Sequence, residues 1–502
     1  MNPVLLHDIL DRRTELTPDA PALTSTGRTW SYGELRDLTV AGARWLRRHG
    51  VGRGNRVLTL ASSDPLAVVA GYAASRVGAI HVVVSDGTRP FHLAHIRTDC
   101  TPRLVLATRD AFPAARLLTG PPVHCLDELT EDRTAEPPPG RPCLSIDPMA
   151  LIYTSGSTAM PKAVVSTHRQ VLFAARAIQD RLGYRHDDSV FCCLPLCFDY
   201  GLYQAFLCCL SGARLVLGSG ADAGPALLGR VRDEQATVLP AVPSLTATLA
   251  RLLGRTHQTL RRLRMVTNTG AALSPTTCAR LRALVPGLAI VPMFGLTECK
   301  RVSIDEPNAD LVRPGSVGLP LPDTEAFVVD RQGRRLPAGE VGELVVRGPH
   351  VMSGYWRAPV LTSRRFRRDE LGQQLLYTGD SCRFDAQGHL YFVGRQDDIY
   401  KQHGFRVSSV EVEAAAADVP NVELAAVLPP QDGRGARLYV TGSVSLAELT
   451  TGLAARLEPV KIPDEVLVVD SIPLTVNGKI DKRSLGEEMA VAGVTANAGG
   501  AR

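Results

Sequence analysis

The sequence LIYTSGSTAMPKAVVSTH, residues 151–168, joins an apolar run to small and hydroxylated residues, and these end at Met160, Pro161 and one lysine, Lys162. It lacks the Gly-Lys-Ser/Thr ending of a P-loop and the three spaced glycines of the dinucleotide fingerprint. Its backbone amides, hydroxyl groups and ammonium are nevertheless donors that suit phosphate oxygens. The stretch therefore indicates a triphosphate-binding loop, and an ordinary Ser/Thr surface loop is the alternative.

On both sides of this loop, strand-like and helix-like patterns alternate. TWSY (29–32), the helical pattern 33–50 and VLTLA (57–61) come first, and further apolar runs follow at 79–84, 103–108, 149–154, 213–218, 236–242, 264–270 and 288–295. Helical stretches such as GPALLGRVRDEQA (224–236) separate many of them. This alternation predicts an α/β fold whose sheets are mostly parallel and flanked by helices.

The pattern changes after about residue 317, where short runs alternate with Gly and Pro turns. This change predicts a small antiparallel, barrel-like β region that completes an N-terminal domain of residues 1–394. A hinge at 395–398, a small α+β domain at 399–487 and a disordered tail at 488–502 are expected to follow. The Pro-rich stretch 135–142 is expected to be a surface loop.

Composition limits the class of protein. A chain of 502 residues, 45% of them hydrophobic and 21% charged, is expected to be globular with two or more domains. A net charge of only +5 argues against a nucleic-acid partner, and no apolar run is long enough to span a membrane. The N-terminus shows no signal peptide, and the spacing of the eleven cysteines fits no zinc site. Reduced thiols and a cytoplasmic location are therefore expected.

Lysine is scarce in this chain. Six of its 56 basic residues are lysines, at positions 162, 300, 401, 461, 479 and 482. Lysine is a compact, flexible point charge, whereas arginine is a broad planar fork. A lysine that persists against such an arginine-rich background indicates a place where the compact cation is needed, although residual composition can explain any single one.

Seven further motifs follow the loop in a familiar order: PLCFDYGLY (195–203), TNTGAALS (267–274), FGLTE (294–298), GELVVRGPHVMSGYW (342–356), YTGD (377–380), GRQDDIYKQHGFRVSSVEVE (394–413) and LTVNGKIDK (474–482). Together with residues 153–162, they resemble the motifs of the adenylate-forming superfamily, which includes acyl-CoA synthetases, nonribosomal peptide adenylation domains and luciferases. The resemblance covers about residues 20–485. It implies ATP-dependent activation of a carboxylic acid as an acyl-adenylate, with release of pyrophosphate.

The resemblance implies a nucleotide site and a metal site. Glu298 would be a Mg²⁺ ligand and a catalytic residue, and Asp380 would accept hydrogen bonds from the ribose hydroxyls. The ATP-binding residues would be Thr154, Ser155, Gly156, Ser157, Thr158, Lys162, Gly270, Ala271, Phe294, Gly295, Thr297, Asp380 and Arg395.

The resemblance also assigns a second catalytic residue, Lys479, to the reacting carboxylate and the α-phosphate. Asp397 would be the hinge about which the small domain rotates before a thiol attacks the adenylate, with Gly404 nearby. The acceptor would be the phosphopantetheine arm of a separate carrier protein, or coenzyme A.

Two alanines depart from the family pattern. Ala159 and Ala163 stand where the family usually has glycine. Because alanine adopts positive φ values less readily and adds a methyl group, the fit of the phosphate loop is expected to be less secure.

The acid pocket is the least determined part of the site. The residues predicted to line it are Asp199, Tyr200, Tyr203, Pro240, Thr269, Met293 and Arg301. Asp199 matches a position that binds an α-amino group in amino-acid-activating members, but FDYG also occurs in members that activate plain acyl groups. The tyrosines and Met293 argue against a long fatty chain. If Lys300 or Arg301 points inward, the substrate would carry a second anionic or polar group; if both point outward, they would meet pyrophosphate or a carrier protein.

These inferences predict an ATP- and Mg²⁺-dependent enzyme. It would activate a small carboxylic acid, predicted to be an amino acid (α or β), and load it onto a carrier protein. A CoA ligase and a non-catalytic nucleotide-binding relative are the alternatives.

Overall fold

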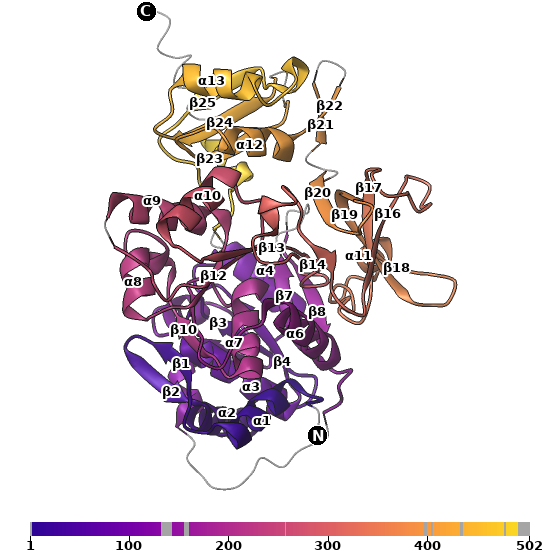
Figure 1. Cartoon of the computed structure of the whole chain (residues 1–502). Helices are drawn as coiled ribbons and strands as arrows, with labels where there is room; N and C mark the ends of the chain where they lie inside the picture. Colours follow the sequence, from indigo (N-terminus) through magenta and orange to yellow (C-terminus); the bar gives the residue numbers. More distant parts are fainter. Residues whose placement is uncertain are drawn as a thin grey trace, which may run out of the picture.

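The structure is a computed structural model that describes residues 3–131, 143–154, 160–256, 258–395, 399–402, 405–431, 435–475 and 478–489. Two large sheets, a smaller curled sheet and a C-terminal unit make up the molecule (Figure 1). The predicted surface loop at 135–142 lies outside the described residues, as do Asp397 and Gly404. The helical assignment reaches residue 489, so residues 488 and 489 of the predicted tail are helical, and residues 490–502 lie outside the described part.

The first large sheet has six strands in the order β6 (Val123–Cys125), β5 (Leu104–Ala107), β3 (Arg56–Leu60), β4 (Ile80–Val84), β7 (Pro148–Thr154) and β8 (Lys162–Thr167). All pairs are parallel except β7 with β8. Every residue of β4, IHVVV, is buried. A largely apolar run of this kind, interrupted here only by His81, is typical of a strand covered on both faces.

The second large sheet has nine strands in the order β15 (Leu319–Pro320), β14 (Ser303–Ile304), β13 (Ala289–Phe294), β12 (Met265–Asn268), β11 (Val238–Ala241), β9 (Ser189–Cys192), β10 (Arg214–Leu217), β1 (Pro21–Ser25) and β2 (Arg28–Ser31). Its centre, from β13 to β1, is parallel, and the antiparallel pairs lie at the two edges. The sequence prediction of mostly parallel sheets is therefore confirmed.

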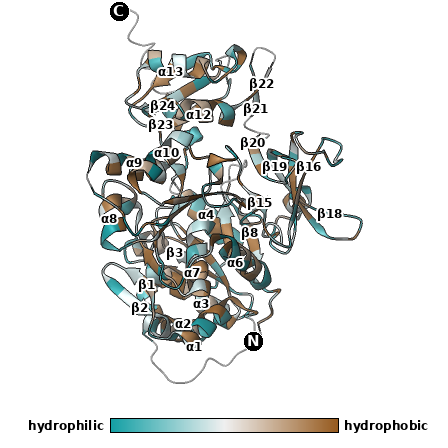
Figure 2. Cartoon of the chain, viewed as in Figure 1, coloured by the Kyte–Doolittle hydropathy of each residue, from teal (hydrophilic) through white to brown (hydrophobic). Residues whose placement is uncertain are grey.

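Helices cover these sheets, and two of them are buried on nearly all sides. The helices are α1 (Leu6–Leu16), α2 (Tyr32–Arg48), α3 (Pro65–Val77), α4 (Pro90–Cys100), α5 (Phe112–Ala115), α6 (His168–Leu182), α7 (Asp199–Ser211), α8 (Leu227–Asp233), α9 (Pro243–Arg255) and α10 (Pro275–Leu284). Short 3-10 turns are η1 (Leu126–Thr130), η2 (Gly220–Ala223) and η3 (Ala309–Leu311). The buried pair, α3 and α7, belongs to one large core that draws residues from both sheets. Figure 2 shows hydrophobic residues gathered in the inner strands and helices.

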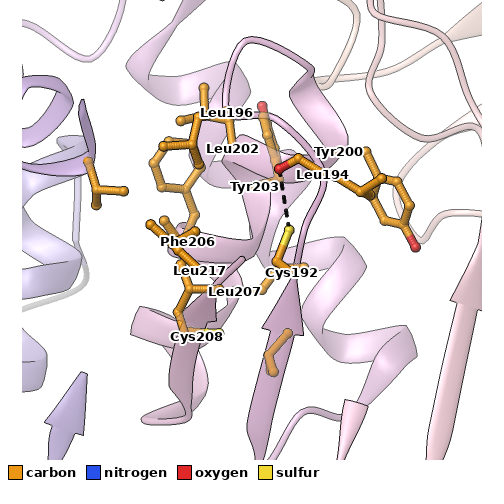
Figure 3. Packing of buried hydrophobic residues seen from close by; sticks show 14 of the residues in the cluster. Cys192, Leu194, Leu196, Tyr200, Leu202, Tyr203, Phe206, Leu207, Cys208 and Leu217 are labelled. Carbon is orange, nitrogen blue, oxygen red and sulfur yellow. Dashed lines mark hydrogen bonds between the residues drawn. The ribbon is translucent and has the colours of Figure 1, made fainter. Parts of the chain in front are cut away.

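The segment that connects β9 to α7 is held by this core. Cys192, Leu194 and Leu196 pack with Phe206 and Leu207 of α7, and Tyr200 lies on the other side of Cys192 from Phe206 (Figure 3). Five of the eleven cysteines lie between residues 192 and 209: Cys192, Cys193, Cys208 and Cys209 are buried, Cys197 is half-buried, and all five are free thiols. Burial raises the pKa of the Cys192 thiol to about 12. These cysteines therefore act as small core residues.

The curled sheet contains β16 (Glu325–Val329), β17 (Gly342–Arg347), β19 (Gln374–Phe384), β18 (Phe366–Arg368) and β20 (Leu390–Arg395), and α11 (Pro359–Arg365) lies beside it. Its pairs are antiparallel, as the short runs after residue 317 predict. Figure 1 shows it at the side of the two large sheets.

The C-terminal unit has its own core. It comprises the hairpin β21 (Ile399–Gln402) and β22 (Phe405–Ser408), the sheet β23 (Val422–Leu428), β24 (Arg437–Gly442) and β25 (Glu465–Val468), the helices α12 (Ser409–Ala417) and α13 (Leu446–Ala454), and the 3-10 turn η5 (Pro459–Lys461). It lies over α9 and α10 in Figure 1. Ser244 Oγ of α9 donates to the carbonyl of Gly478 at 2.8 Å. This bond brings the NGK turn to the large sheets.

Candidate active site

The base of the phosphate loop is formed by two paired strands. Thr154 ends β7 and Lys162 begins β8, and the two residues are partners in the register. Ser155, Gly156, Ser157, Thr158 and Ala159 lie outside the described residues. Thr154 Oγ1 is buried and has no hydrogen-bond partner among the residues that the structure describes. At the residue that precedes the loop, this hydroxyl is therefore a buried polar group that a ligand could satisfy.

Ala163 causes no backbone strain. It is buried in β8, pairs with Tyr153 and does not have a positive φ. Because the chain is extended here, an alanine methyl fits where the family usually has glycine. The expected penalty at this position is therefore absent, and Ala159 lies outside the described residues.

Lys162 lies beside Glu298, the predicted metal ligand. The ammonium donates to the Tyr355 hydroxyl at 3.0 Å and lies 3.9 Å from Glu298 Oε1. The same hydroxyl donates to Glu298 Oε1 at 2.6 Å. Burial lowers the pKa of Lys162, and the Glu298 charge opposes this shift. The structure therefore brings Lys162 and Glu298, both predicted site residues, together through Tyr355, which was not among the predicted residues.

The chemistry of this end fits Mg²⁺. Within the described residues there is no group of three metal-ligating side chains. Magnesium ordinarily needs only one or two protein carboxylates, because waters and phosphate oxygens complete its shell. Glu298 is the carboxylate that would hold the ion, with the nucleotide phosphates supplying further oxygens.

Several of the predicted ATP-binding residues lie at the end of β13 or just after the ends of β12 and β13. Gly270 has φ +96°, and Asn268 Nδ2 donates to the Ala271 carbonyl at 2.9 Å. Phe294 stacks on Phe392 with ring centroids 5.3 Å apart. Thr297 is half-buried.

Gly295 has a separate role in shaping the turn. A Cβ there would collide with the Lys300 carbonyl. Only glycine therefore lets residues 295–301 fold back tightly onto the end of β13.

The predicted ribose-side residues are paired across the curled sheet. Asp380 of β19 faces Arg395 of β20 in the register, and Arg395 Nε lies 3.4 Å from Asp380 Oδ1. The Asp380 residue is buried, whereas half of the Arg395 side chain is exposed.

At the acid end, Lys300 and Arg301 both point inward. They are 2% and 6% exposed, and Lys300 Nζ lies 3.9 Å from Asp199 Oδ2. Lys300 has φ +63°, a left-handed conformation that is unusual for a lysine and commonly marks a functional position. Lys300 Nζ and Arg301 Nε have no hydrogen-bond acceptor among the described residues. Buried charged donors without acceptors are costly unless a ligand completes them.

The other predicted pocket residues surround this pair. Arg301 donates to Thr269 Oγ1 at 3.5 Å and lies 5.1 Å above the Tyr200 ring, and Tyr200 Oη is bonded to Thr267. Tyr203 is buried, with its hydroxyl unpartnered within the described part of the chain. Pro240 and Met293 are buried in β11 and β13.

Lys479 reaches the same place from the C-terminal unit. Its ammonium lies 5.5 Å from the centre of the Phe198 ring, and a Cβ on Gly270 would come within 3.0 Å of its Cε. The Lys479 residue as a whole is solvent-exposed, yet the surrounding protein desolvates its ammonium and lowers its pKa. Asp199 opposes that shift, whereas Arg395 and Arg301 reinforce it. Asp199 thus lies 3.9 Å from one cation, Lys300, and close enough to a second, Lys479, to influence its pKa.

A large cleft lies away from this cluster. It has a volume of about 1370 Å³, and Trp30, Asp64, Asp86 and Cys193 are among its lining residues. None of the predicted site residues lines it. The candidate active site is therefore defined by its side chains and not by this cleft.

The comparisons with known proteins agree with this geometry. The model of the AMP-binding enzyme family matches residues 10–356, and that of the AMP-binding enzyme C-terminal domain matches residues 411–479. The chain belongs to the AMP-binding enzyme family, whose members are adenylate-forming. It is therefore an adenylate-forming ligase that activates a carboxylic acid.

Three proteins show the range of its relatives. Tyrocidine synthase 3 of Brevibacillus parabrevis is 28% identical over 495 residues, and the match covers 96% of this chain but only 8% of that protein. VinN in complex with L-aspartate is 40% identical with a TM-score of 0.72, covering 78% of this chain and 98% of the other. ATP-bound MatB from Rhodopseudomonas palustris is 26% identical with a TM-score of 0.83, covering 96% and 98%.

Two contributors were not predicted as site residues. Tyr355 lies inside a quoted motif, but nothing in the sequence shows that its hydroxyl bridges Lys162 and Glu298. The sequence places Lys300 beside Arg301 but does not give the direction of its side chain, although the scarcity of lysine is a signal that Lys300 has a role. No described helix is both long and apolar enough to cross a bilayer.

Proposed function

We propose that this enzyme adenylates a small amino acid that carries a second carboxylate, and transfers it to the phosphopantetheine thiol of a carrier protein. The observation that carries the first part is the inward orientation of Lys300 and Arg301. Two neighbouring buried cations and one buried carboxylate, Asp199, which lies 3.9 Å from Lys300, sum to a charge of +1 before Lys479 is counted. A ligand that brings an ammonium and an extra carboxylate adds no net charge, but it gives Asp199 a cation and the two buried cations an anion to bind.

Each group of such a substrate has a partner. The ammonium binds Asp199, and the non-reacting carboxylate accepts hydrogen bonds from Lys300 and Arg301. Tyr203 and Met293 limit the length of the acid, which favours a molecule about the size of aspartate. The 40% identity to VinN, solved with L-aspartate, supports this size and charge.

The reacting carboxylate then meets ATP. One of its oxygens attacks the α-phosphorus, the bond from the α-phosphorus to the bridging oxygen breaks, and pyrophosphate leaves. Two anions approach each other in this step, so its barrier depends on positioning and charge neutralisation. Lys479 supplies the cation between the carboxylate and the α-phosphate, Lys162 the cation at the outer phosphates, and Asp380 with Arg395 holds the ribose. Mg²⁺, held by Glu298, would supply further charge neutralisation to the phosphates.

Pyrophosphate exchange with matched acids tests the substrate. Aspartate, asparagine, β-alanine, alanine and succinate differ in the second carboxylate or in the amine. The wild-type chain should prefer aspartate to β-alanine and alanine by at least about 100-fold, because buried charged donors left unpaired penalise analogues that lack the carboxylate. Equal exchange with aspartate and β-alanine would contradict the proposal.

Substitution of Lys300 sharpens this test. Lys300→Met keeps an apolar side chain of similar length and should lower kcat/KM for aspartate by about 100-fold, since the hydrogen bond to a charged group is lost. Its kcat/KM for β-alanine should change much less.

The identity of the thiol acceptor is tested with the wild-type enzyme. Thioester formation on a carrier protein, and not on free coenzyme A, is expected, and the reverse result would favour the CoA ligase.

A further inference from the structure

The Tyr355 hydroxyl lies between the two groups that the proposed function assigns to the phosphates and the metal. It accepts from Lys162 at 3.0 Å and donates to Glu298 at 2.6 Å, while the ammonium and the carboxylate remain 3.9 Å apart. The Lys162 ammonium also lies 4.2 Å from the centre of the Tyr355 ring. Three segments that are far apart in the sequence meet at this one oxygen atom.

The backbone fixes Tyr355 in place. Val165 N donates to the Gly354 carbonyl and Trp356 N to the Ala163 carbonyl, both at 2.9 Å, so residues 353–356 extend the edge of β8. Met352 N donates to the carbonyl of Glu298 at 2.9 Å. The segment before Tyr355 is therefore hydrogen-bonded both to the strand that begins at Lys162 and to the residue that carries the carboxylate.

The side chain is fixed as well. The Tyr355 ring meets the Phe366 ring edge-on, with ring centroids 5.4 Å apart. The backbone amide of Tyr355 donates to Thr362 Oγ1 at 3.0 Å. A Cβ on Gly354 would collide with Thr362, so this residue must be glycine for the segment to pack as it does. The ring is part of the core of the curled sheet, and only its hydroxyl reaches the site.

The hydroxyl changes what Lys162 and Glu298 can do. Without it, the ammonium and the carboxylate would be free to close into a direct ion pair, which occupies the carboxylate and turns the lysine away from an incoming phosphate. With the hydroxyl in place, the Lys162 ammonium and the Glu298 carboxylate each make one hydrogen bond that fixes their direction. The ammonium still has donors, and the carboxylate still has acceptor positions, for a ligand.

We propose that Tyr355 is a positioning residue that holds Lys162 and Glu298 apart and aims them at the phosphates and the metal of bound ATP. This inference rests on the proposed roles of those two residues. It concerns the nucleotide alone and does not depend on which acid the enzyme activates.

Calorimetric titration of the full chain with ATP, with excess Mg²⁺ and with EDTA, tests the inference without any acid present. Tyr355→Phe removes one oxygen and keeps the packed ring. It should weaken Mg²⁺-ATP binding about tenfold, since a hydrogen bond to a charged group is lost, and metal-free ATP binding by a smaller factor. The unfolding midpoint should stay within a few degrees of the wild-type value, because the ring packing is kept.

Tyr391→Phe is the matched control. The Tyr391 hydroxyl donates to a carboxylate, Asp385, at 3.3 Å in the same sheet but away from the site. This variant should bind ATP as the wild type does under both conditions. A similar loss in both variants would mean that any tyrosine of this sheet acts through general stability, and it would overturn the proposal.

A Glu298→Gln background supplies a second measurement. If Tyr355 acts on the metal through Glu298, adding Tyr355→Phe to Glu298→Gln should remove no further Mg²⁺-dependent affinity. Losses that simply add, unchanged ATP affinity in Tyr355→Phe, or equal losses with and without Mg²⁺ would each refute the positioning role. Failure of aspartate to support pyrophosphate exchange would leave all of these results intact.

Discussion

The phosphate end and the acid end of the site balance their charges in opposite ways. At the phosphate end, Lys162, Tyr355 and Glu298 satisfy one another through hydrogen bonds. At the acid end, Lys300 and Arg301 carry buried donors that lack acceptors within the described chain, and a single carboxylate, Asp199, faces them and Lys479.

This difference bears on what each end of the site can reveal. At the phosphate end the charged groups already have partners, so they say little about the particular ligand. A pocket with unbalanced charge must be completed by its own substrate, so its unpaired groups describe that substrate. Variants at the two ends should therefore fail in different ways.

Lys479→Ala is expected to have the largest effect. Removal of the cation between two reacting anions should lower pyrophosphate exchange by about a thousandfold, because such a group acts mainly in the transition state. ATP affinity, measured by titration, should remain near that of the wild type. Exchange at the wild-type rate would refute the role assigned to Lys479.

Asp199→Asn should have the next largest effect on pyrophosphate exchange, and mainly with acids that carry an amino group. The variant should lose about 100-fold in kcat/KM for an amino-acid substrate, because the substrate ammonium loses its counter-charge. Exchange with succinate, which has no amine, should fall far less. An equal loss with both acids would show that Asp199 supports the pocket structurally and does not bind an amine.

Lys482→Gln should have the smallest effect and serves as a lysine control. Lys482 Nζ lies 2.8 Å from Glu413 of α12, and nearly a third of its side chain is exposed. Partly exposed ion pairs contribute about 0–1 kcal/mol, so exchange should stay within about twofold and the unfolding midpoint should shift little. A large loss of exchange would show that the lysines of the C-terminal unit act together.

Much of the fold could be predicted from the sequence because its signals are local. The largely apolar run at 79–84 predicts a strand, and all five residues of β4 are buried. The tight turn at Gly295 and the strand pairing of Ala163 could not be predicted, because they depend on atoms far apart in the sequence. The proposed boundaries at 394–399 stay predictions, since Asp397 lies outside the described residues.

The site could be predicted as a set of residues but not as a geometry. The motifs bring Lys162, Glu298, Asp380 and Lys479 to one region, yet no pattern gives the direction of a side chain. Lys300 turns inward through a left-handed backbone conformation, which most residues can adopt only at a cost. The bridge through Tyr355 depends on hydrogen bonds between three separate segments. For these reasons neither the orientation of Lys300 nor the bridging role of Tyr355 can be predicted from the sequence.

The rarity of lysine has a consequence for covalent chemistry. An amine-directed acylating reagent meets only six side-chain targets in this chain, and Lys162, Lys300 and Lys479 all belong to the site. Desolvation lowers the pKa of all three, and Lys300 is only 2% exposed, so Lys162 and Lys479 are the members of this group that a reagent reaches more readily. Modification of Lys162 or Lys479 should therefore inactivate the enzyme, modification of Lys482 should not, and bound nucleotide should shield Lys162.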